Sequence, residues 1–342
     1  MKSCFILNDT RPEKHHGCEI VMRHLFRGLK EHDIKILGTL PIGNKINETN
    51  FTAFTTANFI IINGEGTMHH DASYAQYLLE CGINAKKNGQ KVFLINSTWQ
   101  DNSKEMLLKL AQFDGVWLRD NKSLKEVINL VPHALYAPDL TLAYPYQIPN
   151  CEQENNTIAI TDSVFSNIST QSSNFAKNKK AKYIPIIMPI PTSPINLGYD
   201  KKKLRKLKFY KFLSLVTCNY YKPRRYYQDL QLALATPEEY WLTLKRSNSL
   251  IAGRYHAVCF GIQLNTPLFA LNSNTNKVEN LLLDIGLEPK YRITTLDKLT
   301  ELSTQEIIQL SKWSDEEQLK INNFKTKAIT SIQQMFAMIR DS

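Results

Sequence analysis

The stretch Leu250-Ile251-Ala252-Gly253-Arg254-Tyr255-His256-Ala257-Val258 has the pattern of a strand, a tight turn and the start of a helix. In an α/β sheet such a turn lies at the carboxyl end of a strand, where ligands usually bind. The first N–H groups of the helix favour an anion there. Arg254 adds a cation with a fork of donors, and His256 adds a group that titrates near neutral pH. The stretch therefore predicts an anion site.

Strand-like apolar runs alternate with helical patterns on both sides of this stretch. The predicted strands are residues 5–7, 34–37, 59–62, 92–95, 115–118, 158–160, 183–188, 213–216, 250–252 and 268–270, and a further strand that runs into residues 137–139. The predicted helices are residues 18–30, 74–87, 104–111, 123–130, 226–235, 237–247, 276–283 and 314–340. Such alternation predicts an α/β fold with parallel, doubly wound sheets.

A chain of 342 residues is longer than one hydrophobic core usually serves, so we expect two domains. The polar, proline-containing segment 145–156 is the candidate linker. The predicted domains are residues 1–148 and 156–313, both Rossmann-like and facing a cleft. Residues 314–342 form a last helix that we expect to pack back across both domains.

The composition is that of an ordinary globular protein, with 43% hydrophobic residues. No apolar run approaches the roughly 18 residues that span a bilayer, and residues 1–9 lack the apolar core of a signal peptide. We therefore expect a cytoplasmic protein. The six cysteines are scattered, which argues against a disulfide framework and against a structural zinc site. No metal is predicted.

The formal net charge is +10, and seven basic residues fall between Lys201 and Lys211. One interpretation is a solvated helix face or loop. The other is a patch that contacts an anionic membrane surface or a polyanionic substrate. No nucleic-acid recognition motif accompanies the patch, so nucleic acid is not among the predicted partners.

A second polar turn, Asn63-Gly64-Glu65-Gly66-Thr67-Met68-His69-His70-Asp71, follows the apolar run 59–62. Its glycines allow a sharp turn and a close approach to a ligand. Glu65, His69, His70 and Asp71 supply four groups that can handle protons. We expect a functional loop, and the alternative is a loop whose polar side chains cap the next helix.

Three further polar turns follow predicted strands. Arg119 would point from its strand end toward a ligand, or form a salt bridge with Asp120 or Asp114. Asp139, after Pro138, would orient an arginine or histidine, or form a simple turn. The turn Asn272-Ser273-Asn274-Thr275-Asn276-Lys277 would bind a phosphate or carboxylate, or serve as an N-cap cluster.

Together these motifs resemble those of the polysaccharide pyruvyl transferases. The resemblance rests on Gly64-Glu65-Gly66-Thr67, Arg119-Asp120 with Ser123, Pro138-Asp139, Gly253-Arg254-Tyr255-His256-Ala257, Pro267 and Lys277. Glu65 stands where a third glycine is common in the family. The resemblance implies a fold like that of GT-B glycosyltransferases. It also implies transfer of pyruvate from phosphoenolpyruvate to a sugar hydroxyl in bacterial surface polysaccharide synthesis, with formation of a ketal and no cofactor.

The resemblance also assigns roles to the candidate residues. It implies that Arg254 and His256 contact the donor phosphoenolpyruvate, with Arg119 as a second cation. The donor side would further include the 272–277 turn, through Ser273, Asn274 and Lys277. The catalytic candidates are His256, Glu65, Asp71 and His69, and the acceptor, a sugar or lipid-linked oligosaccharide, would meet Gly64, Glu65, His69 and His70. Which residue is the general base and which the general acid stays open.

Two other functions fit the same residues. A GT-B glycosyltransferase of capsule or lipopolysaccharide synthesis would use Arg254 and Lys277 to bind the phosphates of a nucleotide sugar, because fold does not fix function. A non-catalytic protein would instead bind an anionic glycan through the basic patch at 201–211.

Overall fold

The computed structural model describes residues 1–188, 229, 232–234, 236–273 and 275–342. The chain divides into two compact units. Unit 1 consists of Met1–Glu13, Val21–Tyr144 and Thr326–Ser342, and unit 2 consists of Lys14–Ile20 and Pro145–Lys325. The division after Tyr144 lies close to the predicted linker. Each unit is built from separate segments of the sequence, whereas each predicted domain was one continuous range.

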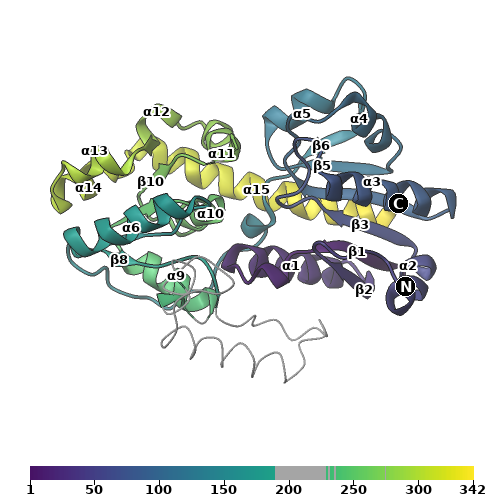
Figure 1. Cartoon of the computed structure of the whole chain (residues 1–342), viewed down its shortest axis with the longest axis horizontal. Coiled ribbons are helices and arrows are strands. Elements are labelled where there is room, and N and C mark those ends of the chain that lie inside the picture. Colours follow the sequence, from purple (N-terminus) through teal and green to yellow (C-terminus); the bar gives the residue numbers. More distant parts are fainter. Residues whose placement is uncertain (189–228, 230–231, 235, 274) are drawn as a thin grey trace. The chain divides into compact units, whose positions relative to one another are not determined.

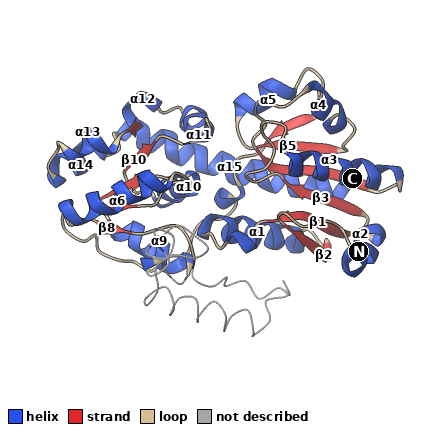
Figure 2. Ribbon diagram, in the orientation of Figure 1, coloured by secondary structure: helices blue, strands red, loops and turns tan. Residues whose placement is uncertain are grey.

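Unit 1 contains a six-stranded parallel sheet in the order β2-β1-β3-β4-β5-β6 (Figures 1 and 2). Its strands are β1 (Ser3–Asp9), β2 (Lys35–Pro41), β3 (Phe59–Asn63), β4 (Lys91–Ser97), β5 (Gly115–Leu118) and β6 (Ala134–Tyr136). The chain passes from β1 to β2 on one side, and then places β3 on the other side of β1. The carboxyl ends of β1 and β3 therefore form the topological switch point, where ligands of such sheets bind.

Hydrophobic side chains cover both faces of this sheet. The helices that connect its strands are α1 (His16–Glu31), α2 (Glu48–Thr56), α3 (Ser73–Lys87), α4 (Lys104–Leu110) and α5 (Asn121–Val127). One buried cluster joins the sheet to side chains of α2 to α5, such as Leu79 and Leu110. The other joins it to α1 and to the end of α15 (Asp315–Asp341), for example through Leu25 and Phe336. Burial on both faces explains why the run 59–62 is entirely apolar.

Unit 2 contains a five-stranded parallel sheet in the order β11-β10-β9-β7-β8. Its strands are β7 (Ile158–Ile160), β8 (Lys182–Tyr183), β9 (Ser249–Ala252), β10 (Leu268–Leu271) and β11 (Ile293–Thr294). Its helices, besides the first part of α15, are α6 (Ser166–Lys179), α9 (Pro237–Arg246), α10 (Tyr255–Leu264), α11 (Lys277–Ile285), α12 (Pro289–Arg292), α13 (Leu296–Thr300) and α14 (Thr304–Ser311). The strands on the two sides of the β7/β9 pair lead away in opposite directions. The switch point of unit 2 therefore lies at the carboxyl ends of β7 and β9.

Two predicted strands are shorter than expected. The strand predicted at 183–188 ends at Tyr183, and residues 186–188 instead pair with residues 14–16 through His16 N–Ile186 O (2.9 Å) and Met188 N–Lys14 O (2.7 Å). Pro185, which has no N–H to donate, stands at this departure from the sheet. β8 is an edge strand. The strand predicted at 137–139 is β6, which ends at Tyr136.

Several helix ends agree with the sequence signals. Thr236 caps α9 with Pro237 in its first turn, and Ser314 and Glu317 form a capping box before α15. Gly286 ends α11 in a left-handed conformation. The strand predicted at 213–216 and the basic patch at 201–211 lie outside the described residues, as does most of the helix predicted at 226–235. Within the described part of the chain, no helix is both long and apolar enough to cross a bilayer.

Candidate functional site

The turn after β9 is held against the end of β7. The N–H of Gly253 donates to the hydroxyl of Thr161 at 2.8 Å. A Cβ atom added to Gly253 would lie 2.4 Å from the carbonyl oxygen of Asp162, so only glycine fits this approach. The turn at Gly253 and Arg254 therefore lies at the switch point of unit 2.

Arg254 is oriented by a buried carboxylate. Its Nε and Nη2 lie 2.9 Å and 2.7 Å from Oδ2 of Asp162, which is 2% exposed, whereas the Arg254 side chain is 25% exposed. The other oxygen of Asp162 accepts the N–H of Ile186 at 2.8 Å. Arg254 is also the N-cap residue of α10, and its side chain does not cap that helix. A fixed cation therefore stands beside N–H groups at a helix start, which suits an anion.

His256 lies in the first turn of α10 and is 8% exposed. Its ring packs edge-on against the ring of His15, with centroids 5.3 Å apart. Gly17, in the first turn of α1, makes this packing possible, because a Cβ at Gly17 would lie 2.2 Å from Cγ of His256. The start of α1, which belongs to unit 2, thus forms one wall around His256.

His15 is partly buried and accepts the N–H of Gly17 on Nδ1 at 3.0 Å. Its pKa is lowered well below the usual value by burial and by the charges of His256, Arg254, His16 and Lys277. His15 is therefore neutral at physiological pH and adds no positive charge to the site.

Lys277 adds a second cation near α10. Its Nζ lies 5.9 Å from the centroid of the Tyr255 ring, above the start of that helix. Asn276 is the N-cap residue of α11, and its side chain makes no capping hydrogen bond. Ser273 is partly buried, and Asn274 lies outside the described residues.

In unit 1, Glu65 is fixed at the β1/β3 switch point. It is 4% exposed, and its Oε2 accepts the hydroxyl of Thr10 at 2.6 Å. A Cβ at Gly64 would lie 2.4 Å from Cβ of Ser97, so glycine is needed for this approach to β4. The amide of Asn8 donates to Asn63 O at 2.6 Å and thereby holds the turn to the end of β1.

The other three polar residues of this turn have different partners. His69 and His70 join through their Nδ1 atoms at 3.0 Å, and Nε2 of His70 lies 3.2 Å from the exposed carboxylate of Asp101. Asp71 accepts the N–H of Ser103 at 2.8 Å, before α4. The N-cap residue of α3 is Ala72, which makes no side-chain cap, so the alternative of a loop that caps the next helix is wrong.

Arg119 pairs with Asp139, a partner that the sequence analysis did not name for it. The Nη1–Oδ2 distance is 3.0 Å, and the two side chains are 3% and 0% exposed. Nε of Arg119 donates to the hydroxyl of Thr98 at 2.7 Å. The prediction that Asp139 orients an arginine is thus confirmed, whereas the salt bridge with Asp120 or Asp114 is wrong. Asp120 instead caps α5 by accepting the N–H of Ser123.

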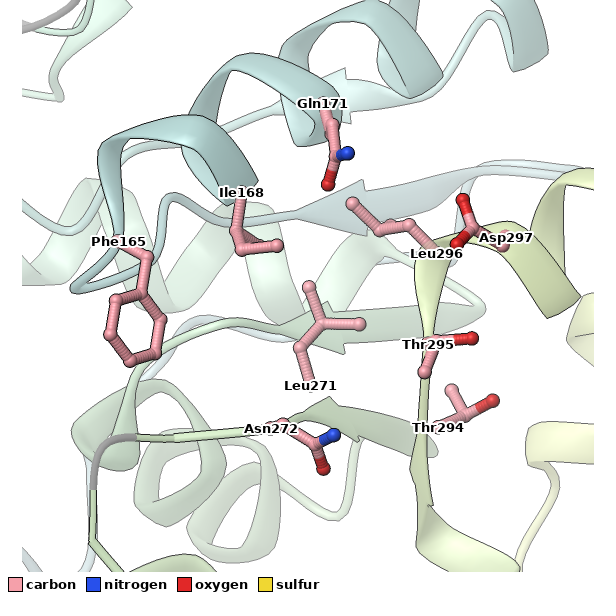
Figure 3. Close-up of a pocket in the computed structure, with 9 residues that line it drawn as sticks. All are labelled: Phe165, Ile168, Gln171, Leu271, Asn272, Thr294, Thr295, Leu296 and Asp297. Atoms are coloured by element: carbon pink, nitrogen blue, oxygen red, sulfur yellow. The ribbon is translucent and has the colours of Figure 1, made fainter.

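A separate pocket of about 280 Å³ opens in unit 2 (Figure 3). It has an apolar part from Ile168, Leu271 and Leu296, with Phe165 at one side. Polar groups of Gln171 and Asp297 lie near its edge. Of the turns predicted to bind a ligand, the 272–277 turn contributes one residue to its lining, Asn272. Among the described residues, no cluster of histidine, cysteine, aspartate and glutamate could hold a metal ion.

Three residues of these two sites were missed in the sequence, namely His15, Asp162 and Thr10. Each follows a strand or precedes a helix, as the recognised candidates do. Asp162 comes two residues after the end of β7, and Thr10 directly after β1. The paired His15-His16 before Gly17 and an amphipathic helix was an available signal.

The chain matches the family model of the polysaccharide pyruvyl transferases over residues 15–275. It therefore belongs to this family and is a transferase. The match begins at His15. It includes the turn after β3, around Glu65, and the turn after β9, around Arg254. No curated protein matches the chain.

Solved structures resemble the chain in fold. The glycotransferase of kitacinnamycin has a TM-score of 0.51 at 7% identity, over 99% of this chain and 98% of that one. A putative UDP-N-acetylglucosamine 2-epimerase from Listeria monocytogenes has a TM-score of 0.50 at 9% identity, over 99% and 98%. The UDP-GlcNAc 2-epimerase of Methanocaldococcus jannaschii has a TM-score of 0.50 at 12% identity, over 96% and 100%. At such identities the likeness shows the fold alone, which is GT-B-like with two Rossmann-like units.

Proposed function

We propose that this polysaccharide pyruvyl transferase takes its pyruvyl group from phosphoenolpyruvate, bound in unit 2 at the turn after β9. The observation that carries the proposal is the orientation of Arg254 by buried Asp162 beside the start of α10. Phosphoenolpyruvate carries a phosphate and a carboxylate, and arginine binds either group with two parallel hydrogen bonds. Lys277 supplies further positive charge, with Ser273 and Asn274 as additional donors.

The reaction that we propose forms a ketal in two additions. A proton is added to the enol methylene carbon, and a sugar hydroxyl forms a bond to C2 as it loses its proton to a base. The C2–O bond to phosphate then breaks, and phosphate leaves with the electron pair. A second sugar hydroxyl adds to C2 and loses its proton, which completes the ketal. These steps need both a general acid and a general base.

His256 is the proposed partner of the leaving phosphate. It lies in the first turn of α10, two residues after Arg254, and its ring is held by His15 and Gly17. An imidazole in this place can bind the phosphate and give it a proton as the C2–O bond breaks.

For the acceptor we propose the turn after β3 in unit 1. Glu65 is the first choice for the base, because its carboxylate is held in place by Thr10 at the β1/β3 switch point. Gly64, His69 and His70 are proposed to contact the sugar. Asp71 stays a weaker catalytic candidate, since its carboxylate already accepts the N–H of Ser103. We retain Arg119 as the second cation for the donor, held by Asp139.

The first test is phosphate release from phosphoenolpyruvate in the presence of sugar and lipid-linked oligosaccharide acceptors. We expect release with at least one acceptor, and a loss of about 100-fold or more in kcat/KM for Arg254→Lys, because lysine cannot make the paired hydrogen bonds. Arg246→Lys is the matched control, at an exposed arginine of the same unit.

Two results would contradict the proposal. One is the absence of both phosphate release and phosphoenolpyruvate binding. The other is thermal stabilisation by a nucleotide sugar but not by phosphoenolpyruvate, which would support the glycosyltransferase alternative.

We also propose that the enzyme acts in the cytoplasm, at the inner membrane, through the basic patch at 201–211. Seven positive side chains in this short segment would be attracted to anionic lipid headgroups. Co-sedimentation of the full chain with anionic vesicles, but not with neutral ones, would support this contact. Equal binding to both would contradict it.

A further inference from the structure

The backbone around His15 is fixed on both sides. His15 forms an antiparallel bridge with Ile187, and its neighbours Lys14 and His16 bond to Met188 and Ile186. Its ring lies 5.3 Å from that of His256, at 65°. His15 therefore belongs structurally to the anion site of unit 2, where its ring holds that of His256, although its own hydrogen-bonding chemistry was not used in the reaction above.

The hydrogen bond from Gly17 determines the tautomer of His15. The N–H of Gly17 donates to Nδ1 at 3.0 Å, so Nδ1 must offer its lone pair and carries no proton. The proton of the neutral ring is then on Nε2. A second proton, on Nδ1, would face the Gly17 N–H and remove the acceptor of a donor in the first turn of α1.

The surroundings of His15 also oppose a positive charge. Burial is the largest cause of its lowered pKa, followed by His256, Arg254, His16 and Lys277. The nearby carboxylate of Asp162 is engaged by Arg254. Residues 184–188, which pair with this segment, contain no ionisable side chain.

We propose that His15 is a permanently neutral hydrogen-bond donor, which offers its Nε2–H to an anionic oxygen of the ligand and transfers no proton. The inference rests on the proposed donor site. No hydrogen bond to a described residue engages Nε2, so this donor is available for a ligand. A neutral donor adds to anion binding without a charge that changes near pH 7, and it leaves proton transfer to His256.

The first experiment observes His15 directly in the full chain. Histidine is labelled with ¹⁵N, and the ring nitrogens are followed by NMR from pH 6 to 8.5, with and without inorganic phosphate. The signals of His15 are assigned by their loss in His15→Asn. We expect the pattern of a neutral Nε2–H ring throughout, with phosphate changing the Nε2 signal. A doubly protonated ring, or a neutral ring with its proton on Nδ1, would overturn the proposal.

The second experiment separates the donor from the helix cap. Asparagine can accept the Gly17 N–H as Nδ1 does, but it lacks the Nε2–H. We expect His15→Asn to keep the thermal midpoint and to weaken phosphate binding by about 10- to 100-fold, as for a lost hydrogen bond to a charged group. Glutamine reaches the Nε2 position with an N–H donor, so His15→Gln should bind phosphate more tightly than His15→Asn.

A third experiment measures how the affinity for phosphate depends on pH. A merely structural role of His15 would not give the profiles that we expect. We expect wild type and His15→Asn to give parallel profiles with a constant offset. If the phosphate affinity of His15→Asn depended less on pH than that of wild type, His15 would take up a proton. If the two affinities were equal, His15 would make no contact with phosphate. Either result would overturn the proposal. Because inorganic phosphate is the probe, failure of pyruvyl transfer alone would leave these outcomes interpretable.

Discussion

His24 is a buried histidine of unit 1 whose environment opposes its charge. Its Nδ1 donates to the carbonyl of Leu140 at 2.6 Å, and its ring packs against Tyr144. Burial lowers its pKa from 6.5 to about 4. The folded state therefore binds fewer protons than the unfolded state between these values, and stability is lost as pH falls from about 6.5 toward 4.

We expect the free energy of unfolding to fall by about 2 kcal/mol between pH 7 and pH 5 because of His24 alone. Asparagine in its place keeps an N–H donor for Leu140 but does not titrate. Urea unfolding of His24→Asn at the two pH values should show a fall that is smaller than that of wild type by this amount. His133→Asn, at an exposed histidine of the same unit, is the control. An unchanged pH dependence in His24→Asn would refute the assignment.

The sequence alone predicts only some of the residues that form the anion site of unit 2. The predicted anion site in unit 2 rests on Arg254 and His256, which stand together in the sequence. Asp162 and His15, which orient them, come from segments about 90 and 240 residues away by the printed numbering. No local pattern connects such segments, so their contacts follow only from the order of strands in the sheet.

Two glycines of α1 allow a ring to pack closely against the helix, and one of these rings belongs to the site. Gly17 lies against His256, and Gly28, further along the same helix, lies against Phe336 in the same manner. At both positions an added Cβ would lie 2.2 Å from a ring atom. Alanine favours a helix over glycine by roughly 1 kcal/mol, so each substitution combines a gain in propensity with a clash.

We expect Gly17→Ala to displace His256 and to lower kcat/KM by about 100-fold, the cost of misplacing a reacting group by about 1 Å. Gly28→Ala is the matched control, which should lower stability through Phe336 and leave kcat/KM unchanged. Activity and thermal midpoints of both variants give the comparison. Full activity in Gly17→Ala would show that His256 does not need its present position.

Helices with strong periodicity were predictable, and those without it were not. α1 and α3 lie within two residues of their predicted starts. α6 was missed because its sequence, SNISTQSSNFAKNK, is rich in serine and asparagine, which are poor helix formers. α12 and α13 were missed because each is short, with four and five residues. Tertiary packing against β7 and its neighbours, rather than local preference, explains why α6 forms a helix.

α15 contributes side chains to the cores of both units. Ile321 is buried in its first part, which belongs to unit 2. Phe336 and Ile339 are buried in its last part, against the sheet of unit 1. The last part of this helix thus belongs to unit 1 and not to a separate segment.

We expect Phe336→Ala to lower the free energy of unfolding by about 3–5 kcal/mol, because it leaves a cavity in a closely packed core. Met338→Ala, at a side chain of the same helix that is 48% exposed, should change it by less than about 0.5 kcal/mol. Urea unfolding of both variants measures the difference. A small effect at Phe336 would mean that α15 is not needed for the core of unit 1.

Because unit 1 is built from segments that lie before and after unit 2, its folding is tied to the order of translation. The strands β1 to β6 leave the ribosome early, but the part of α15 that covers one face of their sheet is translated only after residues 145–325. Until then that apolar face has no cover from Ile332, Met335, Phe336 and Ile339. Nascent chains that expose such surfaces are the usual clients of chaperones, so we expect the yield of this protein to depend on chaperone capacity during synthesis.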